Sequence, residues 1–298
     1  MAPTLEKSDK IKEQTLFFCG GPPKSGTTFL QRLLDLHPDV SCPSEDNLDF
    51  LAHKILSIHD VYNKNLSIVA SRIGVENCPL VDIDVYYQVY GNLVREIAKN
   101  RSLGEPIVGI SDNEFLLNNL APCLQNLFHG SKAILIFRNP IDTAISSWKH
   151  NHRLYKKEGN AKHLEIMKID GKLNLDDYVL SGSKQWNIKT KERLQTAKKL
   201  PESVFVVTYE ALLQNKKETL IKLLDFLGCE YNEAIILDMI KNSAFDVMKS
   251  NSSNPEFFSS GKIRFGQDEL DANTIKAAIK LSADGLKLLN IPLPKNTI

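Results

Sequence analysis

The sequence has 298 residues, 42% of them hydrophobic, and is therefore long and apolar enough to bury a full core. Its 37 lysine and arginine residues almost balance its 36 aspartate and glutamate residues. This balance argues against a nucleic-acid binder or a protein held on an anionic membrane, so any anion site must be local.

Residues 1–14 form a polar, charged N-terminal tail that lacks the apolar core of a signal peptide. No later apolar run approaches the roughly 18 residues of a membrane span. The five cysteines are widely spaced and include no CxxC pair, so neither a disulfide framework nor a zinc site is indicated. We therefore expect a soluble, cytoplasmic protein with reduced, mostly buried thiols and with no membrane or nucleic-acid partner.

The first predicted unit runs from Leu16 to Leu36, with the sequence LFFCGGPPKSGTTFLQRLLDL. Its apolar start predicts a buried strand, the glycines predict a tight loop, and apolar residues at helical spacing predict an amphipathic helix. This order of elements is typical of a phosphate cradle, because backbone N–H groups converge at the positive end of the helix dipole. The residues expected to face an anion are Lys24, Ser25, Gly26, Thr27 and Thr28.

The loop differs from the Walker A pattern GxxxxGK[ST], because Thr27 occupies the Walker lysine position and Lys24 lies inside the bend. PKSGTT instead resembles the 5′-phosphosulfate loop of the sulfotransferases. That resemblance implies 3′-phosphoadenosine 5′-phosphosulfate as the co-substrate, with Lys24 beside the transferred group. The alternative at this point is a Gly-Thr-Thr turn that only starts a helix.

After a predicted short strand at Val40 to Cys42 come the carboxylates Glu45, Asp46 and Asp49. Polysaccharide sulfotransferases carry catalytic carboxylates after a similar LHPDV segment, so the resemblance offers Glu45 as a base. The alternative is a helix N-cap. Residues 51–73 and 81–100 then look helical, with tyrosines that either line an acceptor pocket or, more simply, pack the core: Tyr62, Tyr86, Tyr87 and Tyr90.

The run PIVGI at residues 106–110 predicts a second buried strand, which Asp112 follows before a helical pattern that extends to Phe128. Cytosolic small-molecule sulfotransferases place a catalytic histidine at this point. The resemblance therefore implies that Asp112 takes the place of that base, with Glu45, His150 and His152 as other candidates. A helix N-cap is the alternative for Asp112.

A third strand is predicted at residues 133–137, with Arg138 at its end and Asn139-Pro140 starting a helix that contains Ser146. A guanidinium offers a planar fork for bidentate phosphate binding, and the serine adds a donor. The arginine, Asn-Pro and the serine eight residues after Arg138 match the 3′-phosphate motif of the same family.

Residues 153–177 are polar and weakly patterned, which predicts a flap or insertion. A further strand is predicted at residues 203–208, followed by Tyr209 and a helix that Gly228 ends. In the family, the tyrosine after this strand contacts adenine, and a hydroxyl residue and a phenylalanine follow 34 and 36 residues later. The resemblance thus assigns the base site to Tyr209, Ser243, Phe245 and Phe29.

Near the C terminus, SSGKIRFGQ resembles the last nucleotide-binding loop of the family, although the order of cations and glycines differs. We assign phosphate contact here to Gly261, Lys262 and Arg264. A basic surface turn is the alternative.

Strands that alternate with helices predict an α/β fold with a mainly parallel central sheet, and we expect residues 1–298 to form one domain. The resemblance implies sulfuryl transfer to a hydroxyl or amine of a small-molecule acceptor, with no metal. Carboxylates at the ends of elements suggest a polar acceptor that can be cationic: Glu45, Asp46, Asp49, Asp112 and Glu114. Two alternatives stay open: a P-loop kinase of a nucleoside or small molecule, and a non-catalytic nucleotide-binding protein.

Overall fold

The computed structural model describes residues 14–113, 123–252, 261–263 and 267–292. At its centre is a five-stranded sheet with the order β2 (Val40–Ser41), β3 (Ile107–Ser111), β1 (Thr15–Gly20), β4 (Lys132–Phe137) and β7 (Val204–Thr208). Every neighbouring pair in this sheet is parallel. The predicted α/β fold with a parallel central sheet is therefore confirmed.

The central strand β1 sends successive side chains into two different cores, as the pleat of a strand requires. Phe17 and Cys19 lie in one core, and Phe18 lies in the other. Phe18 pairs in register with Ile110 of β3 and Ala133 of β4, all three fully or almost fully buried. Because both faces are covered, the strands are continuous apolar runs without polar alternation.

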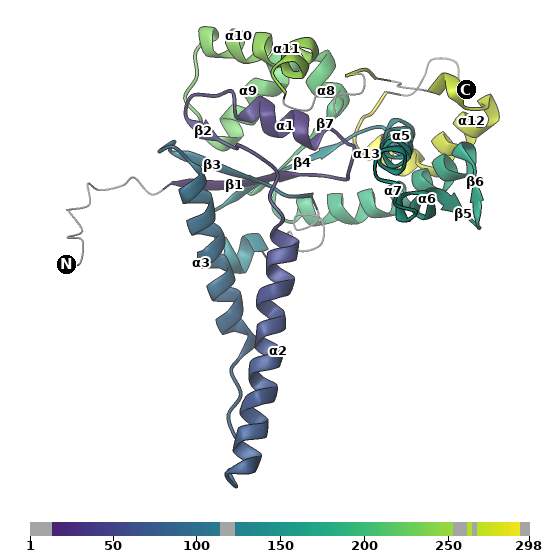
Figure 1. The fold of residues 1–298 in the computed structure, drawn as a ribbon. Coiled ribbons are helices and arrows are strands. Elements are labelled where there is room, and N and C mark those ends of the chain that lie inside the picture. The colour runs from purple at the N-terminus through teal and green to yellow at the C-terminus, as the bar shows by residue number, and fades with distance from the viewer. Residues whose placement is uncertain (1–13, 114–122, 253–260, 264–266, 293–298) are drawn as a thin grey trace.

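Helices cover both faces of the sheet (Figure 1). The core that contains Phe17 is closed by α1 (Thr27–Leu34), α8 (Tyr209–Gln214), α9 (Lys216–Leu227), α10 (Glu233–Asn242) and α11 (Phe245–Ser250). The core that contains Phe18 is closed by α2 (Leu48–Arg72), α3 (Ile83–Arg101), the π-helix η1 (Cys123–Leu127), α7 (Leu175–Lys198) and α13 (Ala283–Leu288). A smaller core joins α7 to α5 (Pro140–Glu158) and α12 (Ala272–Leu281).

The segment 153–177 is more regular than the flap or insertion predicted from its polar composition. Helix α5 continues to Glu158 and ends at Gly159, whose φ of 68° suits a glycine. It is followed by α6 (Lys162–Met167) and by a two-stranded antiparallel ribbon of β5 (Lys168–Ile169) and β6 (Lys172–Leu173). Met167 is fully buried, so even this polar stretch places an apolar side chain in the interior.

Helices α2 and α3 form a long hairpin that projects away from the sheet (Figure 1). Their predicted helical character is confirmed, and both boundaries lie within three residues of the predicted ones. Among the residues that the structure describes, no helix is long and apolar enough to cross a membrane.

Candidate active site

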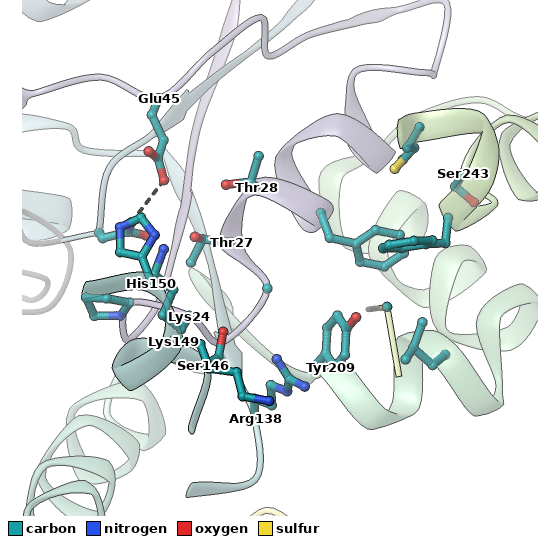
Figure 2. Close-up of a pocket in the computed structure, with 18 of the residues that line it drawn as sticks. Lys24, Thr27, Thr28, Glu45, Arg138, Ser146, Lys149, His150, Tyr209 and Ser243 are labelled. Carbon is teal, nitrogen blue, oxygen red and sulfur yellow. Dashed lines mark hydrogen bonds between the residues drawn. The ribbon is translucent and has the colours of Figure 1, made fainter. Parts of the chain in front are cut away.

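A cavity of about 470 Å³ opens beyond the carboxyl ends of β1, β4 and β7, where ligands bind in open parallel sheets. Side chains from separate motifs converge on it (Figure 2). The predicted site residues that line it are Lys24, Gly26, Thr27, Thr28, Phe29, Glu45, Arg138, Ser146, Tyr209, Ser243, Phe245 and Gly261.

The loop between β1 and α1 is held in shape by its own polar groups. The Ser25 hydroxyl donates to the carbonyl oxygen of Ile136 at 3.1 Å, and the Ser25 N–H donates to the carbonyl of Pro22 at 3.0 Å. Ser25 is fully buried and is not among the residues that line the cavity. In contrast to the prediction, Ser25 therefore does not face the cavity, because its hydroxyl fixes the loop on β4 and its N–H donates within the loop.

Gly26 begins α1 with a φ of 98°, a region that favours glycine. A Cβ at this position would lie 2.5 Å from Cδ2 of Tyr209, so the ring packs directly on the backbone of the loop. Conformation and packing therefore both require glycine here.

We expect Gly26→Ala to lower donor affinity about tenfold and to lower the melting temperature, since αL backbone costs alanine ~1–2 kcal/mol and Tyr209 must also move. The matched control is Gly228→Ala, because Gly228 has a φ of 81° but no atom within 4 Å of an added Cβ. Isothermal titration calorimetry and thermal unfolding of both variants give the comparison. Equal donor affinity in both variants would contradict the role of the Tyr209 contact.

Lys24 lies in the bend with a φ of 68° and lines the cavity. Burial, together with the positive charge of Arg153, lowers the pKa of its ammonium group to about 8, while Glu45 opposes the shift. The Lys24 ammonium group is therefore close to losing its proton at physiological pH. An anionic ligand beside Lys24 would favour the charged form.

This pKa predicts that kcat/KM falls about tenfold per pH unit above pH ~8, because the free protein loses the Lys24 charge there. The free energy of unfolding should instead rise between pH ~8 and ~10.5, since the unfolded chain binds more protons in that range. In Lys24→Arg the guanidinium stays charged, so the alkaline fall should disappear. A pH–rate profile of both proteins checks this, and an unchanged alkaline limb in Lys24→Arg would assign it to another group.

Arg138 is buried at the end of β4 and lies over the ring of Tyr209, with its guanidinium carbon 4.7 Å from the ring centre. Its Nη2 donates to the carbonyl of Lys262 at 3.0 Å and lies 3.5 Å from Oδ2 of Asp142. Its Nε has no hydrogen-bond partner among the described residues. The arginine is therefore held in place and retains a donor that an anion can satisfy.

Two further contacts fix the loop that carries Arg138. The Asn139 N–H donates to Oε1 of Glu210 at 2.9 Å, and the fully buried Asp142 accepts a hydrogen bond from Gln267 at 2.8 Å. Burial raises the pKa of Glu210, although the hydrogen bond from Asn139 opposes that shift. Glu210 directly follows Tyr209, so it links the ring that lies under Arg138 to the loop that carries Arg138.

Aromatic side chains form the wall opposite α5 (Figure 2). The rings of Phe29 and Tyr209 meet edge to face with centres 5.9 Å apart, and Phe245 packs on the backbone of Gly261. Flat rings around an opening of this kind can hold a planar heterocycle. The predicted base site is thus brought together from α1, α8 and α11.

Ser243 and Lys216 form a polar pair at the edge of this wall. Lys216 Nζ donates to the Ser243 hydroxyl at 3.1 Å, and that hydroxyl donates to the carbonyl of Ile240 at 3.0 Å. Burial lowers the pKa of Lys216. Sequence reasoning missed Lys216, because nothing in its helix-start context distinguishes it from a solvated lysine.

The predicted C-terminal contacts are met only in part. Lys262 contributes its backbone carbonyl to Arg138, whereas its side chain is exposed and is not among the residues that line the cavity. The assignment of its ammonium group to phosphate is therefore not supported by this geometry. Arg264 lies outside the described residues.

Of the predicted carboxylates that the structure describes, only Glu45 lines the cavity. Its Oε1 accepts a hydrogen bond from Asn113 at 3.1 Å, and its backbone bridges to Ser111 at the end of β3. A carboxylate is thus held at the edge of the sheet, facing the loop that carries Lys24 (Figure 2).

Asp112 does not reach the cavity, in contrast to its predicted role as the base. It is 3% exposed, and its Oδ2 accepts the N–H of Leu48 at 2.7 Å, at the start of α2. Strand β3 presents Asp112 to the N-terminus of α2, whose own N-cap residue is Asn47, so the carboxylate caps a helix that is distant in sequence. Glu45 therefore takes over as the candidate base.

The other carboxylates have partners elsewhere. Asp46 pairs with Arg101, and Asp49 lies 3.5 Å from His53. Glu114 lies outside the described residues. The expected acidic cluster is therefore absent from the described part of the cavity, and the prediction of a cationic acceptor loses the observation on which it depended.

One face of α5 carries cavity residues at helical spacing: Ser146, Lys149, His150 and Arg153. Arg153 Nη2 lies 3.2 Å from Nδ1 of His150, and burial together with the charges of Lys24 and Arg153 lowers the pKa of His150 to about 4. The imidazole is therefore neutral at physiological pH, with Nδ1 as acceptor. His152 is exposed and is not a lining residue.

Sequence reasoning named His150 but missed Lys149 and Arg153. Their spacing of three and seven residues from Ser146 was the available signal, because those positions share a helix face. The four tyrosines of the hairpin are not lining residues, and only Tyr90 is fully in the core.

The cavity thus combines a strand–loop–helix anion site, a buried arginine, an aromatic wall and one carboxylate. Such a set can bind a nucleotide with phosphates at both ends and can remove a proton from a neighbouring nucleophile.

Comparisons with known proteins agree with this geometry. A family model described as "Sulfotransferase domain" matches residues 14–278. A protein-tyrosine sulfotransferase of Drosophila melanogaster is 24% identical over 235 residues, which cover 76% of this chain and 40% of that protein. Protein-tyrosine sulfotransferase 1 of Danio rerio is 26% identical, again over 76% of this chain but 56% of its own length. The chain therefore spans about half the length of these relatives.

Solved structures share the fold. Mouse sulfotransferase SULT7A1 complexed with PAP superposes with a TM-score of 0.52 at 20% identity, covering 92% of this chain and 84% of that one. Retinol dehydratase in complex with androsterone and the inactive cofactor PAP gives a TM-score of 0.51 at 19% identity, covering 94% and 82%.

Proposed function

The chain belongs to the sulfotransferase domain family, and on that premise we propose that it moves a sulfuryl group from 3′-phosphoadenosine 5′-phosphosulfate to an acceptor hydroxyl beside Lys24 and Glu45. The observation that carries the proposal is the convergence of the PKSGTT loop, Arg138, Ser146 and Tyr209 on one cavity. A Walker-type kinase would need a lysine where this chain has Thr27.

The residues present fit such a co-substrate. The glycine-dependent bend at Gly26 leaves the start of α1 open to a 5′ group, and the buried Nε of Arg138 needs an acceptor. Phe29, Tyr209 and Phe245 suit an adenine ring between them. When bound, the co-substrate supplies the activated sulfuryl group.

In the proposed reaction, Lys24 places its positive charge beside the oxygen that bridges the 5′-phosphate and the sulfuryl group. Negative charge builds up on this oxygen as its bond to sulfur breaks. Glu45 accepts the proton from the acceptor hydroxyl, while Asn113 orients the carboxylate through its 3.1 Å hydrogen bond. Arg138 and Ser146 bind the remote 3′-phosphate, which fixes the distance between donor and acceptor.

We propose that no metal takes part, because five cationic side chains already line the cavity: Lys24, Arg138, Lys149, Arg153 and Lys216. These positive side chains supply the charge neutralisation that magnesium provides for kinases. Turnover that is unchanged by a chelator such as EDTA would support this, and turnover restored only by added magnesium would contradict it.

For the acceptor, we propose a phenolic hydroxyl of a polypeptide tyrosine. Two observations support this choice: the relatives are named protein-tyrosine sulfotransferases, and the candidate base that lines the described cavity, Glu45, is a carboxylate. A phenol loses its proton near pH 10 and so suits a carboxylate base better than an aliphatic alcohol does.

The test is a screen with isotope-labelled donor, in which mass spectrometry locates the transferred sulfate. Its arms are tyrosine peptides, the same peptides with phenylalanine, small phenols, small amines and a heparan-like polyanion. Transfer to tyrosine peptides alone supports the proposal. Transfer confined to small molecules would restore the acceptor class that the sequence predicted.

We retain a cytoplasmic location as a proposal. Cys19 and Cys42 support it, because their sulfur atoms lie 3.8 Å apart as free, buried thiols, a pair that an oxidising compartment would join. Fractionation of cells that express the tagged full-length protein tests it, and recovery from a secretory compartment would contradict it.

A further inference from the structure

Two consecutive lysines start α9, and their side chains have different surroundings. Lys217 is exposed, donates to Oε1 of Glu233 at 2.6 Å and is not among the residues that line the cavity. Lys216 is half-buried and lines the cavity. Burying an ammonium group costs free energy unless acceptors surround it, so the contacts of Lys216 indicate what it binds.

The ammonium group of Lys216 is fixed beside the proposed base site. Its Nζ donates to the Ser243 hydroxyl at 3.1 Å and to the Ser243 carbonyl at 3.3 Å, and it lies 5.5 Å from the centre of the Phe29 ring. An ammonium group has three N–H donors, and its hydrogen bonds to the described residues use two of them. The third N–H can therefore donate to a ligand in the cavity.

The Ser243 hydroxyl beside this donor is oriented as an acceptor. It gives its proton to the carbonyl of Ile240 at 3.0 Å, and one of its two lone pairs accepts from Lys216 Nζ. Ser243 lines the cavity but is only 1% exposed, so its hydroxyl is held in this arrangement. Its second lone pair is left to accept an N–H from a ligand.

The edge of the base site thus presents a hydrogen-bond donor and an acceptor side by side. Adenine presents the complement, because its amino group donates and the ring nitrogens next to that group accept. A 6-oxopurine such as hypoxanthine has a carbonyl oxygen in place of the amino group. That oxygen would face the Ser243 lone pair, and two acceptors repel each other.

The aromatic side chains of the site cannot make this distinction by stacking. The rings of Phe29, Tyr209 and Phe245 can stack on any planar base, since every base has a π-face. A choice between bases needs hydrogen bonds at the base edge, and the pair of Lys216 and Ser243 supplies them.

Resting on the proposed function, we propose that Lys216 and Ser243 select adenine among purine donors. Ser243 accepts from the amino group, and Lys216 donates to the adjacent ring nitrogen. Figure 2 shows Ser243 on the opposite side of the cavity from Glu45, so the pair is remote from the reacting group. Lys216 is therefore a specificity-determining residue, and it restricts the donor to adenosine nucleotides.

The alternative for Lys216 is a structural role at a helix end. Ser243 directly follows the last residue of α10, and a cation beside its carbonyl is favourable at a helix C-terminus. A lysine in that role would stabilise α10 without affecting which base binds. The two roles therefore differ in base preference.

Calorimetry of the full-length protein without magnesium measures that preference. The two ligands are 3′-phosphoadenosine 5′-phosphate and 3′-phosphoinosine 5′-phosphate, which share all phosphates and differ in the base. We expect the unmodified protein to bind the adenosine compound at least ~30-fold more tightly, since a matched pair of edge hydrogen bonds gives discrimination of this order.

Lys216→Met keeps the length of the side chain and removes its charge. It should lower the adenosine-to-inosine ratio of affinities at least ~10-fold, because the ring nitrogen loses its donor and the Ser243 hydroxyl can turn toward an oxo group. The matched control is Lys217→Met, which removes the neighbouring exposed lysine and should keep the ratio of the unmodified protein.

Ser243→Ala gives a result that a structural role of Lys216 does not predict. This variant removes the acceptor and keeps the donor, and a site with donors alone suits an oxo group. The inosine compound should therefore bind at least as tightly as the adenosine compound. Thermal unfolding confirms that each variant is folded.

An adenosine-to-inosine ratio near one in the unmodified protein would overturn the inference. An unchanged ratio in Lys216→Met, or a retained preference for adenosine in Ser243→Ala, would do the same. In each of these cases, preference for 3′-phosphoadenosine 5′-phosphate over adenosine 5′-monophosphate would leave the proposed function standing. Loss of that preference in the unmodified protein would instead overturn the proposed function, and this inference with it.

Discussion

Lys24→Ala is expected to lower kcat by about 10²- to 10³-fold while the Kd of 3′-phosphoadenosine 5′-phosphate changes less than about tenfold. The reason is location: Lys24 lies in the bend at the 5′ end of the cavity, where the bond to the sulfuryl group breaks. A charge that acts on the breaking bond stabilises the transition state more than the bound nucleotide.

The matched control is Lys216→Ala, which removes another partly buried cation from the same cavity. Lys216 lies beside Phe29 and Ser243, at the proposed base site, so its loss should weaken binding and spare kcat. Single-turnover kinetics with saturating donor separate the two effects. If both variants lost only affinity, Lys24 would be a binding residue and the proposed role in the reaction would be wrong.

Glu45→Gln is expected to lower kcat by about 10²- to 10⁴-fold, because the amide keeps the hydrogen bond from Asn113 but cannot accept the acceptor proton. Donor binding, measured by calorimetry, should stay within about threefold. The acidic limb of the pH–rate profile should disappear with the carboxylate.

Asp112→Asn is the comparison that distinguishes the two candidates for the base. This variant should retain kcat within a few-fold and lose about 1–2 kcal/mol of stability, because it weakens a buried N-cap bond to Leu48. Chemical denaturation measures that loss. The opposite pattern, with normal turnover in Glu45→Gln and almost none in Asp112→Asn, would return the role of base to the strand end.

The sheet and the donor cavity were predictable from sequence, because their signals are local. Apolar runs such as Ala133 to Phe137 are typical of strands with both faces covered, and a glycine-containing bend between a strand and a helix is typical of an anion site. Arg138 and Ser146 share one strand–helix unit, so their spacing in sequence fixes their position in space.

The base was harder to predict, because its position depends on how separate segments meet. Asp112 and Glu45 both follow strands that pair in the sheet, and both are plausible N-caps. Which of them faces the cavity depends on the path of α2, which starts where Asp112 accepts the N–H of Leu48. No local pattern contains that long-range contact.

The sequence did not predict the cationic side chains that line the cavity from α5, for a related reason. The carboxylates of residues 45–49 form a cluster in sequence, yet Asp46 pairs with Arg101, a residue at the end of the distant helix α3. Lys149 and Arg153 reach the cavity only because α5 runs beside it. Net charge in sequence is therefore a poor guide to the charge of a cavity built from several elements.

The central claim, that this cavity binds a nucleotide with a 3′-phosphate, is tested most directly by calorimetry without magnesium. The unmodified protein and Arg138→Ala are each titrated with 3′-phosphoadenosine 5′-phosphate and with adenosine 5′-monophosphate, which differ only in the 3′-phosphate. The unmodified protein should bind the bisphosphate at least ~100-fold more tightly, and Arg138→Ala should lose most of that preference, as expected when a buried charged hydrogen bond is removed. Equal affinity for both nucleotides in the unmodified protein, together with tight binding of ATP and magnesium, would contradict the claim and identify a kinase-like site.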